Sequence, residues 1–203
     1  MAAPTSNPSI LKLKVTLLGM KPPIWRRLLV PETMTLAILH EAIQAAMGWY
    51  GGHIHQFEIA GGYFGDPAML EGVADQARTR LSRLVKDGIQ KFKYVYDMGD
   101  NWEHSIVVEG REPAVEGVSY PACVAGKRAC PPEDCGGVWG YQELLEILAT
   151  PGHPEREERL EWLNRELDPE AFSVEAADQR LRARFTVSGK RRPQGGRCVL
   201  KEG

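Results

Sequence analysis

Residues near the start of the chain alternate between apolar and polar, which predicts β-strands. Over residues 11–17 every second residue is Leu or Val, and the residues between them are Lys or Thr. One face of this strand is therefore buried and the other is polar. Residues 24–30 form a second apolar-rich segment that ends at Pro31, and the Gly- and Pro-containing residues 19–23 predict a hairpin between the two.

A helix is predicted after this hairpin, because apolar residues then recur at spacings of three and four. They are Leu36, Leu39, Ile43 and Met47. Thr35 is suited to cap the first turn of the helix, and Gly48 is suited to end it. The apolar stripe is expected to face the sheet.

The middle of the chain returns to strand patterns. Strands are predicted at residues 53–59, 92–96 and 104–108, with a short extended segment at residues 63–64. Residues 98–101 supply the Gly, Asp and Asn of a hairpin turn. The last two strands are therefore expected to pair in antiparallel fashion.

Helices dominate the pattern after residue 111. They are predicted at residues 141–148, at residues 154–166, and from a Ser173 cap to about Phe185. Residues 66–79 have little pattern and are predicted to form a loop, with one helical turn near residues 81–85.

This order of elements predicts an α+β fold with an antiparallel or mixed sheet. Its first elements (strand, strand, helix, strand) resemble a β-grasp core, and further helices follow. We expect one domain over residues 10–187, with a β-rich core at 10–112 and a Cys/Pro/Gly loop and helical part at 113–187. Residues 1–9 are expected to be a disordered N-terminus, and residues 188–203 a basic, flexible tail.

Composition narrows the class of protein. The 203 residues carry a net charge of -2, which gives no general reason to expect nucleic acid or an anionic membrane as a partner. No apolar run approaches the roughly 20 residues that span a bilayer, and residues 1–7 lack the apolar stretch of a secretion signal. A cytoplasmic location is expected, where the four cysteines are thiols or metal ligands rather than disulfides.

Two polar motifs lie on the predicted strands and the turn between them. His53 and His55 are two residues apart, so they share one strand face, either as hydrogen-bonded histidines at the rim of the core or as metal ligands. The turn region adds Asp97, Asp100, Glu103 and His104. These groups suit a hard metal or acid–base chemistry, although Asp also favours turns through local hydrogen bonds. The strand parity of His104 with Ile106 favours a structural role.

The eight residues CPPEDCGG, from Cys130 to Gly137, predict a shaped loop, because Pro and Gly do not suit the interior of a strand or helix. Glu133 and Asp134 are the candidate ligand-binding residues in this loop. A structural zinc site is one alternative, and its ligands would be Cys123, Cys130, Cys135 and His104. The spacing lacks a Cys-x-x-Cys knuckle, so buried free thiols are preferred. A Cys135 nucleophile with His104 as base is a further alternative.

Four motifs in this order resemble the plasmid pRiA4b open-reading-frame-three-like family, whose members are also labelled insertion-sequence passenger proteins, TnpR-like. They are IWRR at 24–27, MGWYGGHIHQF at 47–57, YDMGDNWEH at 96–104 and PPEDCGGVWGY at 131–141. The resemblance covers about residues 10–185 and implies a plasmid or mobile-element origin. It also implies that a shared role falls on Glu133, Asp134, Asp97, Asp100 and His104 rather than on the cysteines. Resolvase activity is not implied, because no catalytic serine among arginines and no helix-turn-helix can be placed.

The sequence therefore favours a non-catalytic binding or accessory protein, with its site where the three polar motifs meet. The alternative is a metal-dependent hydrolase or nuclease that uses the His and Asp residues. The sequence establishes no cofactor, and zinc is the one candidate. A protein partner or a small ligand is favoured over DNA and over a membrane. Weak, sequence-independent contact with nucleic acid is expected only from the tail at 188–203.

Overall fold

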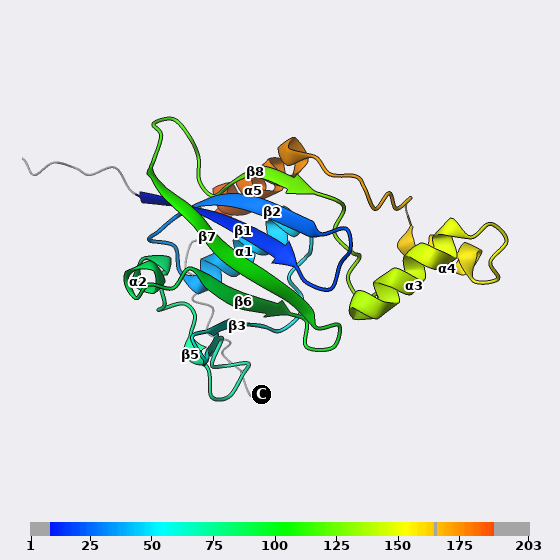
Figure 1. Ribbon diagram of the computed structural model, residues 1–203, viewed down its shortest axis with the longest axis horizontal. Helices are drawn as coiled ribbons and strands as arrows, with labels where there is room; N and C mark the ends of the chain where they lie inside the picture. The colour runs from blue at the N-terminus through cyan, green and yellow to red at the C-terminus, as the bar shows by residue number, and fades with distance from the viewer. Residues whose placement is uncertain (1–8, 165, 189–203) are drawn as a thin grey trace, which may run out of the picture.

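The computed structural model describes residues 9–164 and 166–188, and a single sheet forms its centre (Figure 1). The predicted disordered N-terminus, apart from Ser9, and all but the first residue of the predicted basic tail lie outside these ranges. Five strands form most of the sheet, namely β1 (Ser9–Leu17), β2 (Ile24–Pro31), β6 (Lys91–Tyr96), β7 (Trp102–Pro113) and β8 (Ala122–Lys127). The other three are β3 (His55–Ile59), β4 (Gly62–Gly65) and β5 (Ala74–Asp75).

The strands are ordered β5-β4-β3-β6-β7-β1-β2-β8 across the sheet. All neighbouring strands are antiparallel except β4 and β5, which are parallel. The predicted α+β fold with a mixed sheet is confirmed. The ββαβ order at the start of the chain is present, but strands added on both sides extend it, so the comparison with the β-grasp fold stays a prediction.

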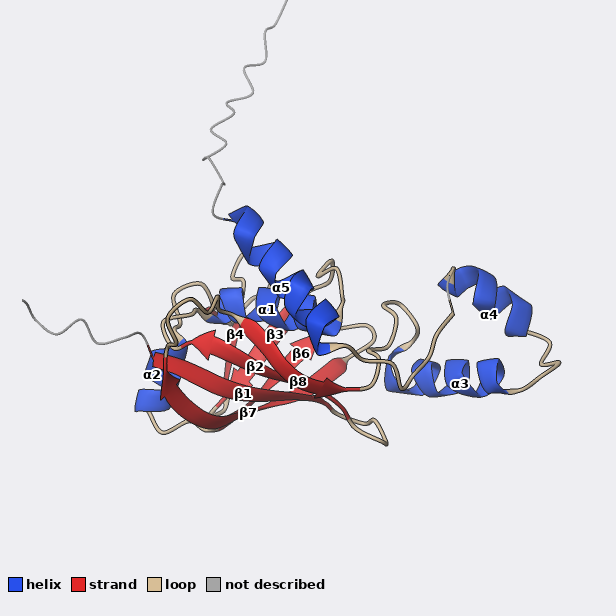
Figure 2. Ribbon diagram, turned by 90° about the horizontal axis from the view of Figure 1, so that it is seen from above, coloured by secondary structure: helices blue, strands red, loops and turns tan. Residues whose placement is uncertain are grey.

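Helices cover one face of the sheet and extend beyond one end of it. Figure 2 shows α1 (Leu36–Met47) and α5 (Val174–Ser188) on the covered face. The helices α3 (Gly137–Ala149) and α4 (Arg156–Leu163) project past the end of the sheet. We call residues 137–163 the helical arm. A short helix, α2 (Leu81–Lys86), precedes β6.

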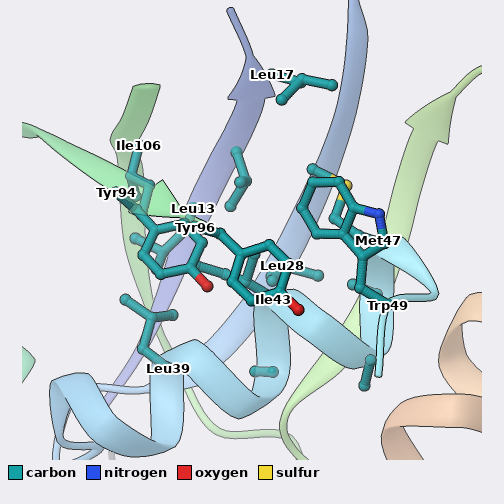
Figure 3. Packing of buried hydrophobic residues seen from close by; sticks show 14 of the residues in the cluster. Leu13, Leu17, Leu28, Leu39, Ile43, Met47, Trp49, Tyr94, Tyr96 and Ile106 are labelled. Carbon is teal, nitrogen blue, oxygen red and sulfur yellow. The ribbon is translucent and has the colours of Figure 1, made fainter. Parts of the chain in front are cut away.

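The core lies between α1 and the inward residues of the central strands (Figure 3). Leu13 and Leu17 of β1 and Leu28 of β2 are fully or almost fully buried, and they face the helix stripe that contains Leu39 and Ile43. The N-terminus of α1 is capped as predicted, because the Thr35 hydroxyl accepts a hydrogen bond from the amide of Ile38. Gly48, at φ 94°, ends the helix in the left-handed conformation that suits glycine.

The opposite face of the sheet has no helix against it among the described residues. Lys12, Lys14 and Arg27 project from it, and Arg27 pairs with Glu109 at 2.6 Å. The Trp25 ring contacts two of these cations, with the ammonium of Lys14 5.1 Å and the guanidinium of Arg27 5.2 Å from its centroid. This face is polar, as the alternation in β1 predicted.

Three sequence predictions differ from the structure. The predicted strand at 53–59 begins only at His55, so His53 does not share its face. The predicted loop at 66–79 contains β5, which is two residues long. The strand β8 was not predicted, because its sequence ACVAGK has no alternation and its pairing with β2 joins residues about 100 positions apart.

Candidate functional site

Three separate chain segments meet beyond the end of β6. They are the loop before β3, the turn between β6 and β7, and the loop that leads into α3. The His53 ring lies between two carboxylates, with Nδ1 3.5 Å from Asp97 Oδ2 and Nε2 3.2 Å from Asp134 Oδ1. The structure therefore brings together one predicted residue from each of the three polar motifs.

This trio has a geometry that suits one divalent cation. A ring nitrogen of His53 and an oxygen from each of Asp97 and Asp134 lie within 4.8 Å of one another, and the described residues contain no other such group of His, Cys, Asp or Glu. The two imidazole nitrogens point in divergent directions, so only one of them can bind a given ion. The Asp134 side chain is 69% exposed and that of Asp97 11%. Such a site would leave coordination positions open to solvent.

Asp97 is also the centre of its turn. It has φ 59°, and its Oδ1 accepts hydrogen bonds from the amides of Gly99 at 2.8 Å and Asp100 at 3.3 Å. These bonds form an Asx turn, the structural role that turns commonly give to Asp. One Asp97 oxygen therefore holds the turn, and the other faces His53.

Glu133 connects the CPPEDCGG loop to the core. One of its carboxylate oxygens accepts a hydrogen bond from the Tyr96 hydroxyl, and the other accepts one from the amide of Tyr50 at 3.0 Å. The indole nitrogen of Trp49 donates to the Pro131 carbonyl at 2.9 Å. Burial, followed by the nearby Glu133 carboxylate, raises the pKa of Tyr96 well above its ordinary value, so this hydroxyl stays a donor. The loop is therefore fixed to the aromatic core at two places.

Like Glu133, the predicted acids Asp100 and Glu103 lie outside the trio. Asp100 has a buried Oδ2 with no hydrogen-bond partner among the described residues. Its backbone carbonyl oxygen packs closely against Gly137, and a Cβ added to Gly137 would lie only 2.3 Å from that oxygen. Glu103 is on β7, one residue from the inward-facing His104, so its side chain points to the opposite face of the sheet.

His55 belongs to a buried cluster rather than to the trio. Its ring stacks on that of His40, with centroids 3.4 Å apart, and its Nε2 contacts the side-chain oxygen of Gln76 at 2.9 Å. His40 Nδ1 lies 2.7 Å from the Tyr94 hydroxyl, which also accepts from Gln44 at 2.9 Å. Sequence reasoning missed His40, although its position four residues after Leu36 places it on the buried stripe of α1.

The His104 side chain is fully buried on the inward face of β7. Neither ring nitrogen has a hydrogen-bond partner among the described residues, and the Trp49 ring meets the imidazole edge-on at 5.5 Å. Burial lowers the pKa of His104 to about 4. This placement agrees with the structural role that strand parity favoured.

The predicted zinc ligands Cys123, Cys130, Cys135 and His104 are not gathered into one site. No group of three of their ligand atoms converges within 4.8 Å. The physical reason is that His104 lies inside the sheet between aromatic rings, whereas Cys123 is on β8 and the other two thiols are in the loop after it. Burial raises the pKa of both Cys130 and Cys135 to about 12, which disfavours the thiolate that a nucleophile requires.

A groove lies beside the trio, between the C-terminal end of α1, the CPPEDCGG loop and the segment that follows α4. Its volume is about 1240 Å³. Aromatic and proline side chains form much of its surface, namely Trp49, Tyr50, Pro131, Pro132, Trp162 and Phe172. Glu133 and Asp134 line it as well, so the trio and the groove are continuous. We call this feature the arm groove.

Two arginines line the arm groove near the end of α1. Arg26 donates to the Ala46 carbonyl at 3.1 Å, and its guanidinium lies 4.2 Å from the Phe172 ring. Arg180 donates to the Ala45 carbonyl at 2.9 Å. Both therefore satisfy carbonyls that the last turn of a helix leaves without partners.

The comparisons with known proteins agree with the motifs described above. Over 157 residues the chain is 46% identical to "Uncharacterized protein y4hQ" of Sinorhizobium fredii, an alignment that covers 76% of this chain and 80% of the relative. The crystal structure of a protein of unknown function, MM3350 from Methanosarcina mazei Go1, matches with a TM-score of 0.78 and 40% identity, covering 84% of this chain and 98% of that one. The family model described as "Plasmid pRiA4b ORF-3-like protein" matches residues 9–176. The chain therefore belongs to the plasmid pRiA4b ORF-3-like family.

Proposed function

We propose that this protein is a non-catalytic binding module of plasmid or mobile-element origin, and that its ligand occupies the arm groove. The observation that carries the proposal is convergence. Segments that are far apart in the sequence contribute Trp49 and Tyr50, Glu133 and Asp134, and Trp162 to one concave surface. A large concave surface on which aromatic side chains and polar groups converge is a common form of ligand site.

The roles of the polar groups in the groove favour binding over catalysis. Glu133 is held by Tyr96 and by the amide of Tyr50, and Arg26 and Arg180 are held by carbonyls of α1. Groups bound in this way position the walls of a groove. The raised pKa of Cys135 similarly disfavours nucleophilic attack.

The test is a ligand screen by amide NMR on the full chain. Compounds and peptides that bind are expected to shift the amides of residues 47–50 and 130–134, and Tyr50→Ala and Trp162→Ala are expected to abolish these shifts. Tyr63→Ala is the matched control, because Tyr63 is a half-exposed aromatic on β4 that does not line the groove. Ligands whose shifts map elsewhere, or persist in both groove variants, would count against the proposal.

A second candidate function is metal-dependent hydrolysis, which the trio of His53, Asp97 and Asp134 favours. A divalent cation held by these groups with open coordination positions can bind and activate a water molecule. Calorimetric titration with manganese or zinc is expected to show one site that His53→Ala removes, and the partly buried His153 of the helical arm supplies the control variant His153→Ala. Titrations that show no site, or no loss in His53→Ala, would exclude this candidate.

A further inference from the structure

The charge of the chain is distributed very unevenly. Residues 133–170 contain eleven Asp and Glu but only three Arg and no Lys. The rest of the chain contains 22 Lys and Arg and 16 Asp and Glu. The net charge of -2 is therefore the sum of an acidic segment and a basic remainder. This segment comprises one wall of the arm groove, the helical arm and the residues that follow α4.

Most acids of this segment are exposed at the surface. Glu143, Glu161 and Glu166 are exposed, and none of them forms an ion pair within the part of the chain that the structure describes. Among the described residues 155–170, two carboxylates form ion pairs with arginine, Glu155 with Arg159 and Glu170 with Arg128. Unpaired charges of one sign on one surface create a potential that attracts the opposite charge.

Exposed aromatic side chains accompany these acids. Trp139 on α3 is 82% exposed and Trp162 on α4 is 46% exposed, and Tyr50, which also lines the groove, is 87% exposed. Trp162 also borders a small hollow between α3 and α4, together with Asp134 and Glu143. An indole face beside carboxylates matches the guanidinium of arginine, which stacks on aromatic rings and pairs with carboxylates.

We propose that the arm groove and the acidic surface of the helical arm bind a basic, Arg- and Lys-rich polypeptide segment of a partner protein. This inference rests on the proposed function and names its ligand class. Charge complementarity identifies the partner as cationic, and the exposed indoles identify Arg as its anchoring residue.

The spacing of the acids distinguishes a polypeptide from a metal ion. Carboxylates that bind one ion must converge, and among the described residues the only convergent group is the trio at His53. The remaining acids are spread singly over α3, α4 and the segment after them. Separate carboxylates match cations that repeat along an extended chain.

The experiment measures binding of fluorescein-labelled peptides to the full chain by fluorescence anisotropy, at low and at physiological salt. The probes are an alternating Arg/Lys peptide and peptides of equal length made of Gln and of Glu. The Arg/Lys peptide is expected to bind, with an affinity that falls as salt increases. The Gln and Glu peptides are expected not to bind, and equal binding of the Gln peptide would overturn the proposal.

Two charge-matched variants test the location of binding. The triple variant Glu143→Gln, Glu161→Gln, Glu166→Gln is expected to bind the Arg/Lys peptide roughly tenfold more weakly. The control triple variant is Glu71→Gln, Glu112→Gln, Glu116→Gln, which changes the net charge by the same amount away from the arm and should alter affinity less than about twofold. Equal losses in both variants would show that only net charge matters and would overturn the proposal. Equal melting temperatures confirm that both variants fold.

Two further outcomes would assign the surface to another occupant. Residues 189–203 contain five Lys and Arg, and tighter peptide binding after all five are changed to Gln would place the chain's own C-terminal segment there instead of a partner. Self-association that the arm triple variant abolishes, seen by sedimentation, would replace the partner by a second copy.

The failure of this inference is distinguishable from that of the proposed function. If a neutral ligand shifts the groove amides and Trp162→Ala removes the shift, the groove binds a ligand that is not basic. If no ligand maps to the groove, the proposed function itself is wrong.

Discussion

The rings of His40 and His55 stack face to face, with centroids 3.4 Å apart and planes 1° from parallel. One ring comes from α1 and the other from β3, so the pair connects the helix to the sheet. In-plane lone pairs of two parallel rings cannot converge on one ion, which excludes a shared metal. Two imidazolium ions at this separation would repel strongly, so the pair must remain largely neutral.

Acid is therefore expected to destabilise the protein through its buried histidines. Burial, with the nearby His55, lowers the pKa of His40 to about 3, and burial lowers that of His104 to about 4. Both pKa values lie below the ordinary unfolded value of about 6.5, so the unfolded chain binds more protons as the pH falls from about 6.5 towards about 4. The free energy of unfolding is expected to decrease by about 1.4 kcal/mol per pH unit for each histidine over this window.

Urea unfolding at several pH values measures this slope. His40→Gln is expected to reduce it relative to the wild type and to the control His153→Gln. A slope that His40→Gln leaves unchanged would contradict the prediction.

The Tyr96–Glu133 hydrogen bond is expected to stabilise the CPPEDCGG loop. Tyr96 is fully buried, so Glu133→Ala would leave its hydroxyl without a partner and lower the free energy of unfolding by about 1–3 kcal/mol. A double-mutant cycle with Tyr96→Phe measures the pair directly. A coupling energy near zero would show that the contact contributes nothing to stability.

Gly140 in α3 is expected to tolerate no side chain. A Cβ at this position would lie 2.0 Å from the carbonyl oxygen of Cys135, which is backbone and cannot move aside independently. Gly140→Ala is expected to destabilise the protein by roughly 2 kcal/mol or more, as measured by thermal unfolding. Gly52→Ala is the control, since a Cβ there meets no atom within 4 Å. Equal melting temperatures for the two variants would refute the expected close approach.

His104 is expected to be replaceable by an apolar residue of similar size. Both of its nitrogens are buried without partners, so His104→Leu removes two unpaired polar atoms and should change stability by less than about 1 kcal/mol. His104→Ala leaves a cavity and should cost about 2–4 kcal/mol. Loss of stability in His104→Leu as large as that in His104→Ala would show that the imidazole makes an essential polar contact.

Local pattern was sufficient for most of the fold and for part of the site. Alternation predicted β1, and the stripe with its Thr35 and Gly48 ends predicted α1, because burial on one face and capping are encoded within a few residues. Asp97, His53 and Asp134 were all named from sequence. Their convergence was not predicted, because it depends on where the CPPEDCGG loop folds back against the β6–β7 turn.

The sequence predictions failed where long-range packing decides the structure. The strand β8 forms because β2 offers an edge to pair with, not because ACVAGK favours a strand. His53 lies outside the strand in which it was predicted, since Gly51 and Gly52 precede it and β3 begins only at His55.

The sequence contains no apolar run long enough to span a bilayer. Within the described residues no helix has the length and apolarity to cross a bilayer.

The two edges of the sheet offer little backbone for another chain to pair with. At one edge β5 has only two residues, so few of its amide and carbonyl groups remain available. At the other edge α5 lies along β8, and the Asp178 carboxylate accepts a hydrogen bond from the amide of Cys123 at 3.1 Å. A shift in register opposite Arg27 and Leu28 further disrupts this edge strand. Both edges therefore disfavour growth of the sheet by addition of strands from other chains.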